Sequence, residues 1–198
     1  MVLSGNTAGA PCRYIAGKTN KMKKTALRYG LYGIYTILAV FLLSWLLMSS
    51  GTDNYQAREV VGWTGIFLSV VFVFFGLKYY RDKQNGGSLS FMEGLKLGLL
   101  IVLFPSVAFG LFNVFYILVL DPQFLDKYYG YQVEQLKGSV PAAELDRRIR
   151  EVQDMREMFS SPFIQFIVMF LSVAAIGLIV TVVSTLILKR NAGKPAVA

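Results

Sequence analysis

Side chains that carry out nucleophilic or metal chemistry are scarce in this sequence. Histidine is absent, and Cys12 is the single cysteine. These absences exclude a His/Cys metal cluster, a disulfide within the chain, and a Ser-His or Cys-His pair. A site built from carboxylates alone stays open. We predict no catalytic residues, no metal site and no cofactor, and we expect that the protein is not an enzyme.

A few polar or helix-breaking residues stand inside long apolar stretches. Asn113 lies within residues 97–120, which contain no charged residue. Such an amide more often donates to or accepts from a neighbouring helix than serves transport, and an ion path would need buried Asp, Glu or Lys. Pro105-Ser106 lies in the same stretch and suits either a hinge in a transport path or a static kink. Asn113, Pro105 and Ser106 are therefore candidate functional positions.

The elements that must position these residues are four uncharged stretches, at residues 29–52, 60–77, 97–120 and 158–188. Even the shortest would form about 27 Å of helix, close to the roughly 30 Å of a hydrocarbon core. We therefore predict an all-α membrane protein with a four-transmembrane-helix bundle. The predicted membrane domain covers residues 22–190, with spans at 27–48, 60–77, 94–120 and 162–188.

The distribution of charge orients these spans. The segment before the first span, the loop between the second and third spans, and the tail hold 13 of the 20 basic residues and only 2 of the 12 acidic ones. Because Lys and Arg stay on the cytoplasmic side, we expect both termini in the cytoplasm. Nucleic-acid binding explains the net charge of +8 less well, since no basic stretch is interleaved with aromatics on an independent domain. In the loop, Lys78, Arg81 and Lys83 form a candidate contact for anionic lipid.

Two short sequence patterns predict a helix start and helix-packing positions. Ser90-Phe91-Met92-Glu93 fits a capping box, which predicts that the third helix begins near Phe91. Small residues recur four positions apart, a spacing that lets helices approach closely. The sets are Gly94 and Gly98, Ser106 and Gly110, and Gly177 with Thr181 and Thr185. We interpret these residues as packing positions of the bundle, although a homodimer could use the last set.

The connection between the third and fourth spans, residues 121–160, has the pattern of two amphipathic helices. Ser139-Val140-Pro141 separates them, so we predict a helical hairpin outside the membrane. Its apolar stripes must pack on each other, on the membrane surface or on a partner. One stripe is a candidate partner face, made of Leu145, Ile149, Val152 and Phe159.

The two ends of the chain are polar. Residues 1–21 lack an apolar core, which excludes a secretory signal peptide. They are either a flexible leader or the product of a start placed too far upstream of Met22-Lys23-Lys24, and we favour the second. Residues 191–198 are predicted to be a cytoplasmic tail.

The loop and its flanks resemble a known family. The order of motifs is similar to that of bacterial membrane proteins called domain of unknown function 4199, over residues 22–190. The resemblance implies four spans and a bacterial inner-membrane location, and it brings no activity or catalytic residues. The motifs that carry it are Lys78-Tyr79-Tyr80-Arg81-Asp82-Lys83, Asn85-Gly86-Gly87 and Ser90-Phe91.

Two classes of function remain open. The protein is either a non-catalytic accessory subunit that docks a partner through the external hairpin, or a small oligomeric transporter or channel component. Its expected partners are the lipid bilayer and either a protein or further copies of the chain, with no nucleic acid. The absence of charge from the centres of the spans favours the accessory role over an ion-driven one.

Overall fold

The computed structural model describes residues 10–49 and 55–190, nearly all of them helical. Residues 1–9, 50–54 and 191–198 lie outside the described residues, and so do the start of the predicted leader and the predicted tail. Within the described ranges, six α-helices and two π-helical turns follow one another. They are α1 (Ala10–Ser49), α2 (Tyr55–Tyr79), η2 (Tyr80–Gln84), α3 (Phe91–Phe115), η3 (Tyr116–Leu120), α4 (Phe124–Ser139), α5 (Ala142–Met158) and α6 (Pro162–Leu188).

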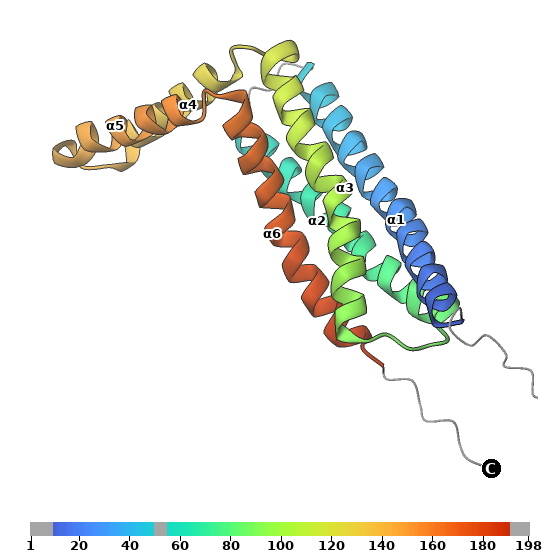
Figure 1. Cartoon of the computed structure of the whole chain (residues 1–198). Coiled ribbons are helices and arrows are strands. Elements are labelled where there is room, and N and C mark those ends of the chain that lie inside the picture. Colours follow the sequence, from blue (N-terminus) through green and yellow to red (C-terminus); the bar gives the residue numbers. More distant parts are fainter. Residues whose placement is uncertain (1–9, 50–54, 191–198) are drawn as a thin grey trace, which may run out of the picture.

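Four of these helices lie side by side as a bundle, formed by α1, α2, α3 and α6 (Figure 1). Each is long and apolar enough to cross a membrane. Their outward side chains include many large apolar ones, such as Phe67, Leu111 and Ile179. A water-soluble protein of this kind would place such side chains in its core. The predicted fold class is confirmed: the chain is an all-α, multi-pass membrane protein.

The first helix begins earlier than the sequence predicts. α1 starts at Ala10, whereas a flexible leader is expected over residues 1–21. Extending an existing helix adds one backbone hydrogen bond per residue without a new nucleation step. Contacts with the bundle also hold this extension, because Lys18 forms an ion pair with Glu93 of α3. The expectation of a flexible leader does not hold for residues 10–21.

The most extensive helix interface joins α3 and α6. Small residues of one helix lie opposite β-branched residues of the other: Gly94 against Thr185, Gly98 against Thr181 and, with the roles reversed, Gly177 against Val102. A Cβ added at Gly94 would lie 2.5 Å from Thr185 Cγ2, so the close approach requires glycine. Both threonines are fully buried. The last small-residue set therefore packs within the bundle and is not exposed for a homodimer.

Packing differs between the two ends of the bundle. Leu77, Tyr80, Leu89, Leu97 and Leu188 form a tightly buried cluster at the end where α6 finishes. The loop between the second and third spans closes this end, since Leu89 and Arg190 exchange two backbone hydrogen bonds of 2.8 and 3.0 Å. The opposite end contains a cavity.

The helices α4 and α5, together called the arm, form a hairpin that turns away from the bundle (Figure 1). They pack on each other rather than on the spans, and an ion pair joins Arg156 of α5 to Asp126 of α4. The break between them lies at the predicted residues, since α4 ends at Ser139 and α5 begins at Ala142. The position of the arm outside the membrane stays a prediction.

Candidate functional site

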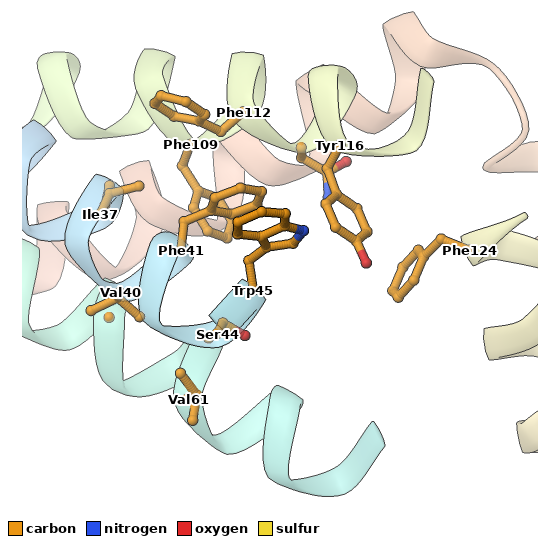
Figure 2. Close-up of a pocket in the computed structure, with 13 residues that line it drawn as sticks. Ile37, Val40, Phe41, Ser44, Trp45, Val61, Phe109, Phe112, Tyr116 and Phe124 are labelled. Carbon is orange, nitrogen blue, oxygen red and sulfur yellow. The ribbon is translucent and has the colours of Figure 1, made fainter. Parts of the chain in front are cut away.

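The cavity lies between α1, α2 and α3, next to the start of α4, and has a volume of about 180 Å³. Six of its thirteen lining residues are aromatic. Figure 2 shows Phe41 and Trp45 of α1 facing Phe109 of α3 and Tyr116 of η3. The cavity has the character of a small-molecule site, which is typically concave and mostly apolar with few polar groups.

A series of ring contacts connects the cavity to the arm. The ring of Phe41 lies 5.8 Å from that of Phe112 and 5.7 Å from that of Tyr116, between centroids. Tyr116 in turn lies 5.2 Å from Phe124, the first residue of α4, in an edge-to-face arrangement. Because Phe124 also lines the cavity, a movement of the arm would change the shape of the cavity wall.

Asn113 supplies a polar group to this apolar wall. Its Oδ1 atom is buried and has no hydrogen-bond partner among the described residues. The structure therefore shows no bond from this oxygen to a neighbouring helix in the described part of the chain, and the role of the Asn113 amide stays a prediction. The physical reason for the missing bond is that Asn113 faces a cavity whose other walls are chiefly hydrocarbon. A buried acceptor without a donor costs about 1–3 kcal/mol, and a bound molecule with one donor group would remove that cost.

Pro105 and Ser106 lie away from this cavity, in the packed part of α3. Both are buried, and the Ser106 hydroxyl donates to the carbonyl of Val102 over 2.9 Å. Proline removes the backbone donor for the carbonyl of Ile101, so the serine bonds the adjacent carbonyl rather than the one that proline leaves free. A Cβ on Gly33 of α1 would lie 3.3 Å from the proline ring. The close packing favours a static role over a hinge.

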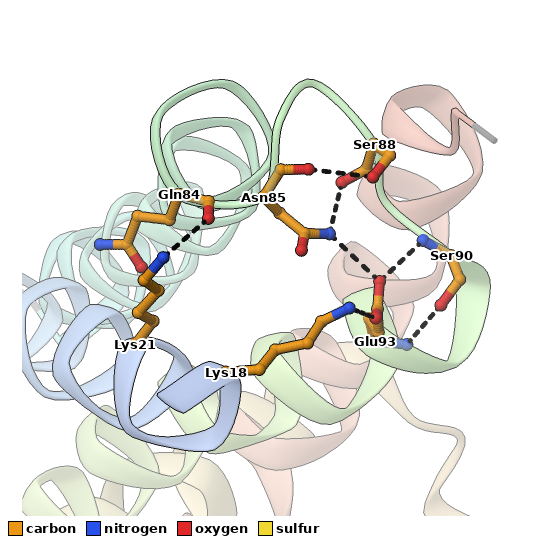
Figure 3. A network of polar contacts seen from close by, with 7 residues as sticks. All are labelled: Lys18, Lys21, Gln84, Asn85, Ser88, Ser90 and Glu93. Atoms are coloured by element: carbon orange, nitrogen blue, oxygen red, sulfur yellow. Dashed lines mark hydrogen bonds and ion pairs between the residues drawn. The ribbon is translucent and has the colours of Figure 1, made fainter. Parts of the chain in front are cut away.

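At the opposite end, a polar network fastens the loop between α2 and α3 to the other helices (Figure 3). The carboxylate of Glu93 accepts from the backbone N–H of Ser90 at 3.2 Å and from Asn85 at 3.4 Å, and it pairs with Lys18 of α1. Lys21 donates to the carbonyl of Gln84 over 3.5 Å. We call this group the loop clasp, formed by Lys18, Lys21, Thr25, Gln84, Asn85, Ser88, Ser90 and Glu93.

The loop clasp gives a structural reason for the residue types in the loop motif that carries the family resemblance. Gly86 and Gly87 have φ angles of +62° and +76°, which favour glycine. The Asn85 side chain donates to the carbonyl of Ser88 over 2.7 Å, and Ser90 with Glu93 forms the predicted capping box. These residues hold the turn in one conformation, so the motif has a structural role.

The predicted lipid contact is only partly exposed. Lys78 and Lys83 are exposed, but Arg81 pairs with Asp82 at 2.6 Å and donates to the carbonyl of Leu188 over 3.4 Å. That carbonyl belongs to the last turn of α6, where helix carbonyls lack partners within the helix. Arg81 therefore helps to close the end of α6, and Lys78 and Lys83 remain as candidate lipid contacts.

The predicted partner face on α5 is largely used inside the arm. Val152 is 7% exposed, and Leu145, Ile149 and Phe159 are half-buried. Across from them, Tyr129 of α4 is 8% exposed, and its burial raises the pKa of the Tyr129 hydroxyl. Of the three possible contacts for the stripe, the structure shows packing against α4, which buries Val152 and partly covers the other three side chains. A partner contact at this stripe stays a prediction.

The aromatic wall of the cavity was not predicted from the sequence. A signal was present, since Phe41 and Trp45 stand four residues apart and Phe109, Phe112 and Tyr116 follow at intervals of three and four. That spacing places side chains on one helix face, but it does not say which faces meet. Over residues 10–49 and 55–190, no three His, Cys, Asp or Glu residues come close enough to hold a metal ion.

Comparison with known proteins identifies the family of this chain. The model of a family described as a protein of unknown function, DUF4199, matches residues 28–190. No curated protein and no solved structure matches the chain. The matched range contains the loop-clasp residues from Gln84 to Glu93, the cavity-lining segments and the whole arm, which agrees with the resemblance of the loop motif. The chain therefore belongs to the DUF4199 family.

Proposed function

We propose that this protein is a non-catalytic accessory subunit of the bacterial inner membrane, which docks a partner protein through the outward face of its arm. Its termini lie in the cytoplasm and its arm on the other side. The observation that carries the proposal is the arm, a pair of helices that packs on itself and presents a charged face away from its apolar seam.

The orientation is supported by the gathering of basic segments at one end of the bundle. The ion pair between Lys18 and Glu93 brings the first basic segment to the start of α3. The bridge between Leu89 and Arg190 brings the end of α6 to the same loop. The three basic segments thus share the end opposite the arm (Figure 1), as the positive-inside rule requires of a cytoplasmic side.

The outward face of α5 carries Asp146, Arg150, Asp154 and Glu157. Their spacing of four, four and three residues places them on one side of the helix, away from Val152. No ion pair involves them among the described residues, whereas Arg147, Arg148 and Arg156 are all paired. Three acids and one base give the face a net negative charge. Charge complementarity therefore favours a partner with a basic surface.

Photocrosslinking tests this proposal. A photoreactive amino acid at Gln153, an exposed position on the same face, should give one discrete protein adduct in native membranes. The triple variant Asp146→Lys, Asp154→Lys and Glu157→Lys should abolish the adduct, and reversing the basic residues of the identified partner should restore it. A control variant applies the same charge change to the arm's ion-paired acids, Glu134, Glu144 and Glu151. No protein adduct, or one that survives the first variant, contradicts the proposal.

The cavity at Asn113 favours a second candidate, a component of a small oligomeric transporter or channel. Labelling of cysteine variants separates the two functions. In a Cys12→Ser background, Asn113→Cys is compared with Leu111→Cys, whose parent residue is 58% exposed on the outer surface of α3. A water-soluble thiol reagent should reach position 113 faster than position 111 if the cavity belongs to a transport path. Equal or slower labelling at position 113 argues against transport.

A further inference from the structure

A second hollow in the molecule is a long groove on the outer surface of the bundle. It runs along α3, with the start of α1 on one side and α6 on the other, and has a volume of about 820 Å³. We call it the lateral groove, and it does not overlap the cavity at Asn113. Its two ends differ in chemistry.

One end of the lateral groove is basic. Lys18, Lys23 and Lys96 line it beside Glu93. The carboxylate of Glu93 is already held by Lys18 and the loop clasp. Lys23 and Lys96 are exposed and form no ion pair with a described residue. This end therefore presents two positive charges for which the described part of the chain supplies no counter-ion.

The rest of the lateral groove is apolar. Leu99, Leu100 and Leu103 of α3 form one wall, each 39–47% exposed, and Phe170 with Ala174 of α6 forms the other. The lining extends along α3 from Met92 to Ser106. At 1.5 Å per residue that distance is about 21 Å. One leaflet contributes about 15 Å of hydrocarbon and roughly 5–7 Å of headgroup region.

We propose that the lateral groove binds one anionic phospholipid, with its headgroup at Lys23 and Lys96 and one acyl chain along Leu99, Leu103 and Ala174. The charge at one end, the apolar wall beyond it and the length of one leaflet together fit this occupant. A soluble anion would leave the apolar wall unused, and a zwitterionic lipid would gain less from the two lysines. The site is independent of the partner-docking face on the arm.

Native mass spectrometry of the purified full-length protein tests the headgroup. Dioleoyl phosphatidylglycerol should bind, and dioleoyl phosphatidylcholine, with the same chains, should bind more weakly. Each juxtamembrane lysine is worth roughly a 5-fold change, so Lys23→Gln with Lys96→Gln should weaken phosphatidylglycerol binding roughly 30-fold. The control is Lys24→Gln with Lys189→Gln, two exposed lysines at the same end that lie outside the groove, so the same charge is removed. Equal binding of the two lipids, or an equal loss in the control, overturns the proposal.

A second pair of variants tests the acyl chain while keeping every charge. Ala174→Trp fills the deep end of the lateral groove and should remove most phosphatidylglycerol binding. Leu111→Trp places the same side chain on an exposed part of α3 outside the groove and should leave binding unchanged. Elution volume and thermal unfolding of each variant confirm that the bundle is intact. Undiminished binding by a folded Ala174→Trp variant refutes the chain position.

Discussion

Substitution of Gly98 by alanine probes the interface between α3 and α6 directly. A Cβ at this position would lie 2.8 Å from Thr181 Oγ1 and 3.1 Å from Thr181 Cβ, with the methyl group nearer still. Thr181 is fully buried, and its branched side chain has few rotamers available in a helix. Relief of the clash therefore requires a shift of one helix away from the other.

The expected cost follows from two opposing effects. Overpacking a tight core by one methyl group costs about 1–3 kcal/mol, while alanine gains up to about 1 kcal/mol over glycine in a helix interior. Gly62→Ala in α2 isolates the second effect, because a Cβ there meets no atom within 4 Å. Gly98→Ala should thus be about 1–3 kcal/mol less stable than Gly62→Ala. The free energies are measured by reversible unfolding of the purified protein in mixed micelles of mild detergent and dodecyl sulfate.

A compensating substitution makes the test specific. Thr181→Ala removes both the methyl and the hydroxyl group that meet the new Cβ. The hydroxyl has no hydrogen-bond partner in the described part of the chain, so its loss breaks no bond there. The double variant should recover most of the stability lost in Gly98→Ala. The reasoning is refuted if Gly98→Ala is as stable as Gly62→Ala, or if the two substitutions are simply additive.

Four further substitutions test other features. Asn113→Leu should raise the free energy of unfolding by about 1–3 kcal/mol in the same assay, because it replaces an unpartnered amide by a similar volume of hydrocarbon; a decrease would mean that the amide has a partner. Ser90→Ala should cost about 1 kcal/mol by removing the cap of α3, with faster hydrogen exchange at the first amides of that helix; unchanged exchange contradicts the capping role. Val152→Ala should speed hydrogen exchange throughout the arm and leave the spans unchanged, because Val152 lies in the seam between α4 and α5. Arg156→Ala, which breaks an exposed ion pair worth at most about 1 kcal/mol, should affect the arm less than Val152→Ala does, and the reverse order would show that the ion pair holds the arm together.

Features determined within a few residues of sequence could be predicted. The four apolar stretches are long enough to span a bilayer wherever they pack. The capping box at Ser90 and Glu93 needs only the first turn of one helix, and the break at Ser139-Val140-Pro141 likewise depends on local backbone preferences. These predictions are confirmed by the described helices.

Features determined by neighbouring helices could not be predicted. The sequence identifies Asn113 as polar and intramembrane, but only the packed bundle shows that it faces a cavity. The stripe at Leu145 and Val152 is visible in the sequence, whereas its closure against α4 depends on how the arm folds back. The π-helical turn at Tyr80–Gln84 is a further example. Tyr80 at its start is fully buried, and the side chain of Gln84 at its end accepts a hydrogen bond from Thr25 of α1 over 3.0 Å. Both contacts depend on a partner distant in sequence.

The backbone bridge between Leu89 and Arg190 has a consequence for biogenesis. Leu89 is translated long before Arg190, so its amide and carbonyl cannot form the two bonds of 2.8 and 3.0 Å until α6 has entered the membrane. Until then, the loop between α2 and α3 lacks these two hydrogen bonds to the end of α6. Ordering of that loop therefore follows insertion of the fourth span, and protection of the loop from a protease added on its side reports that insertion is complete.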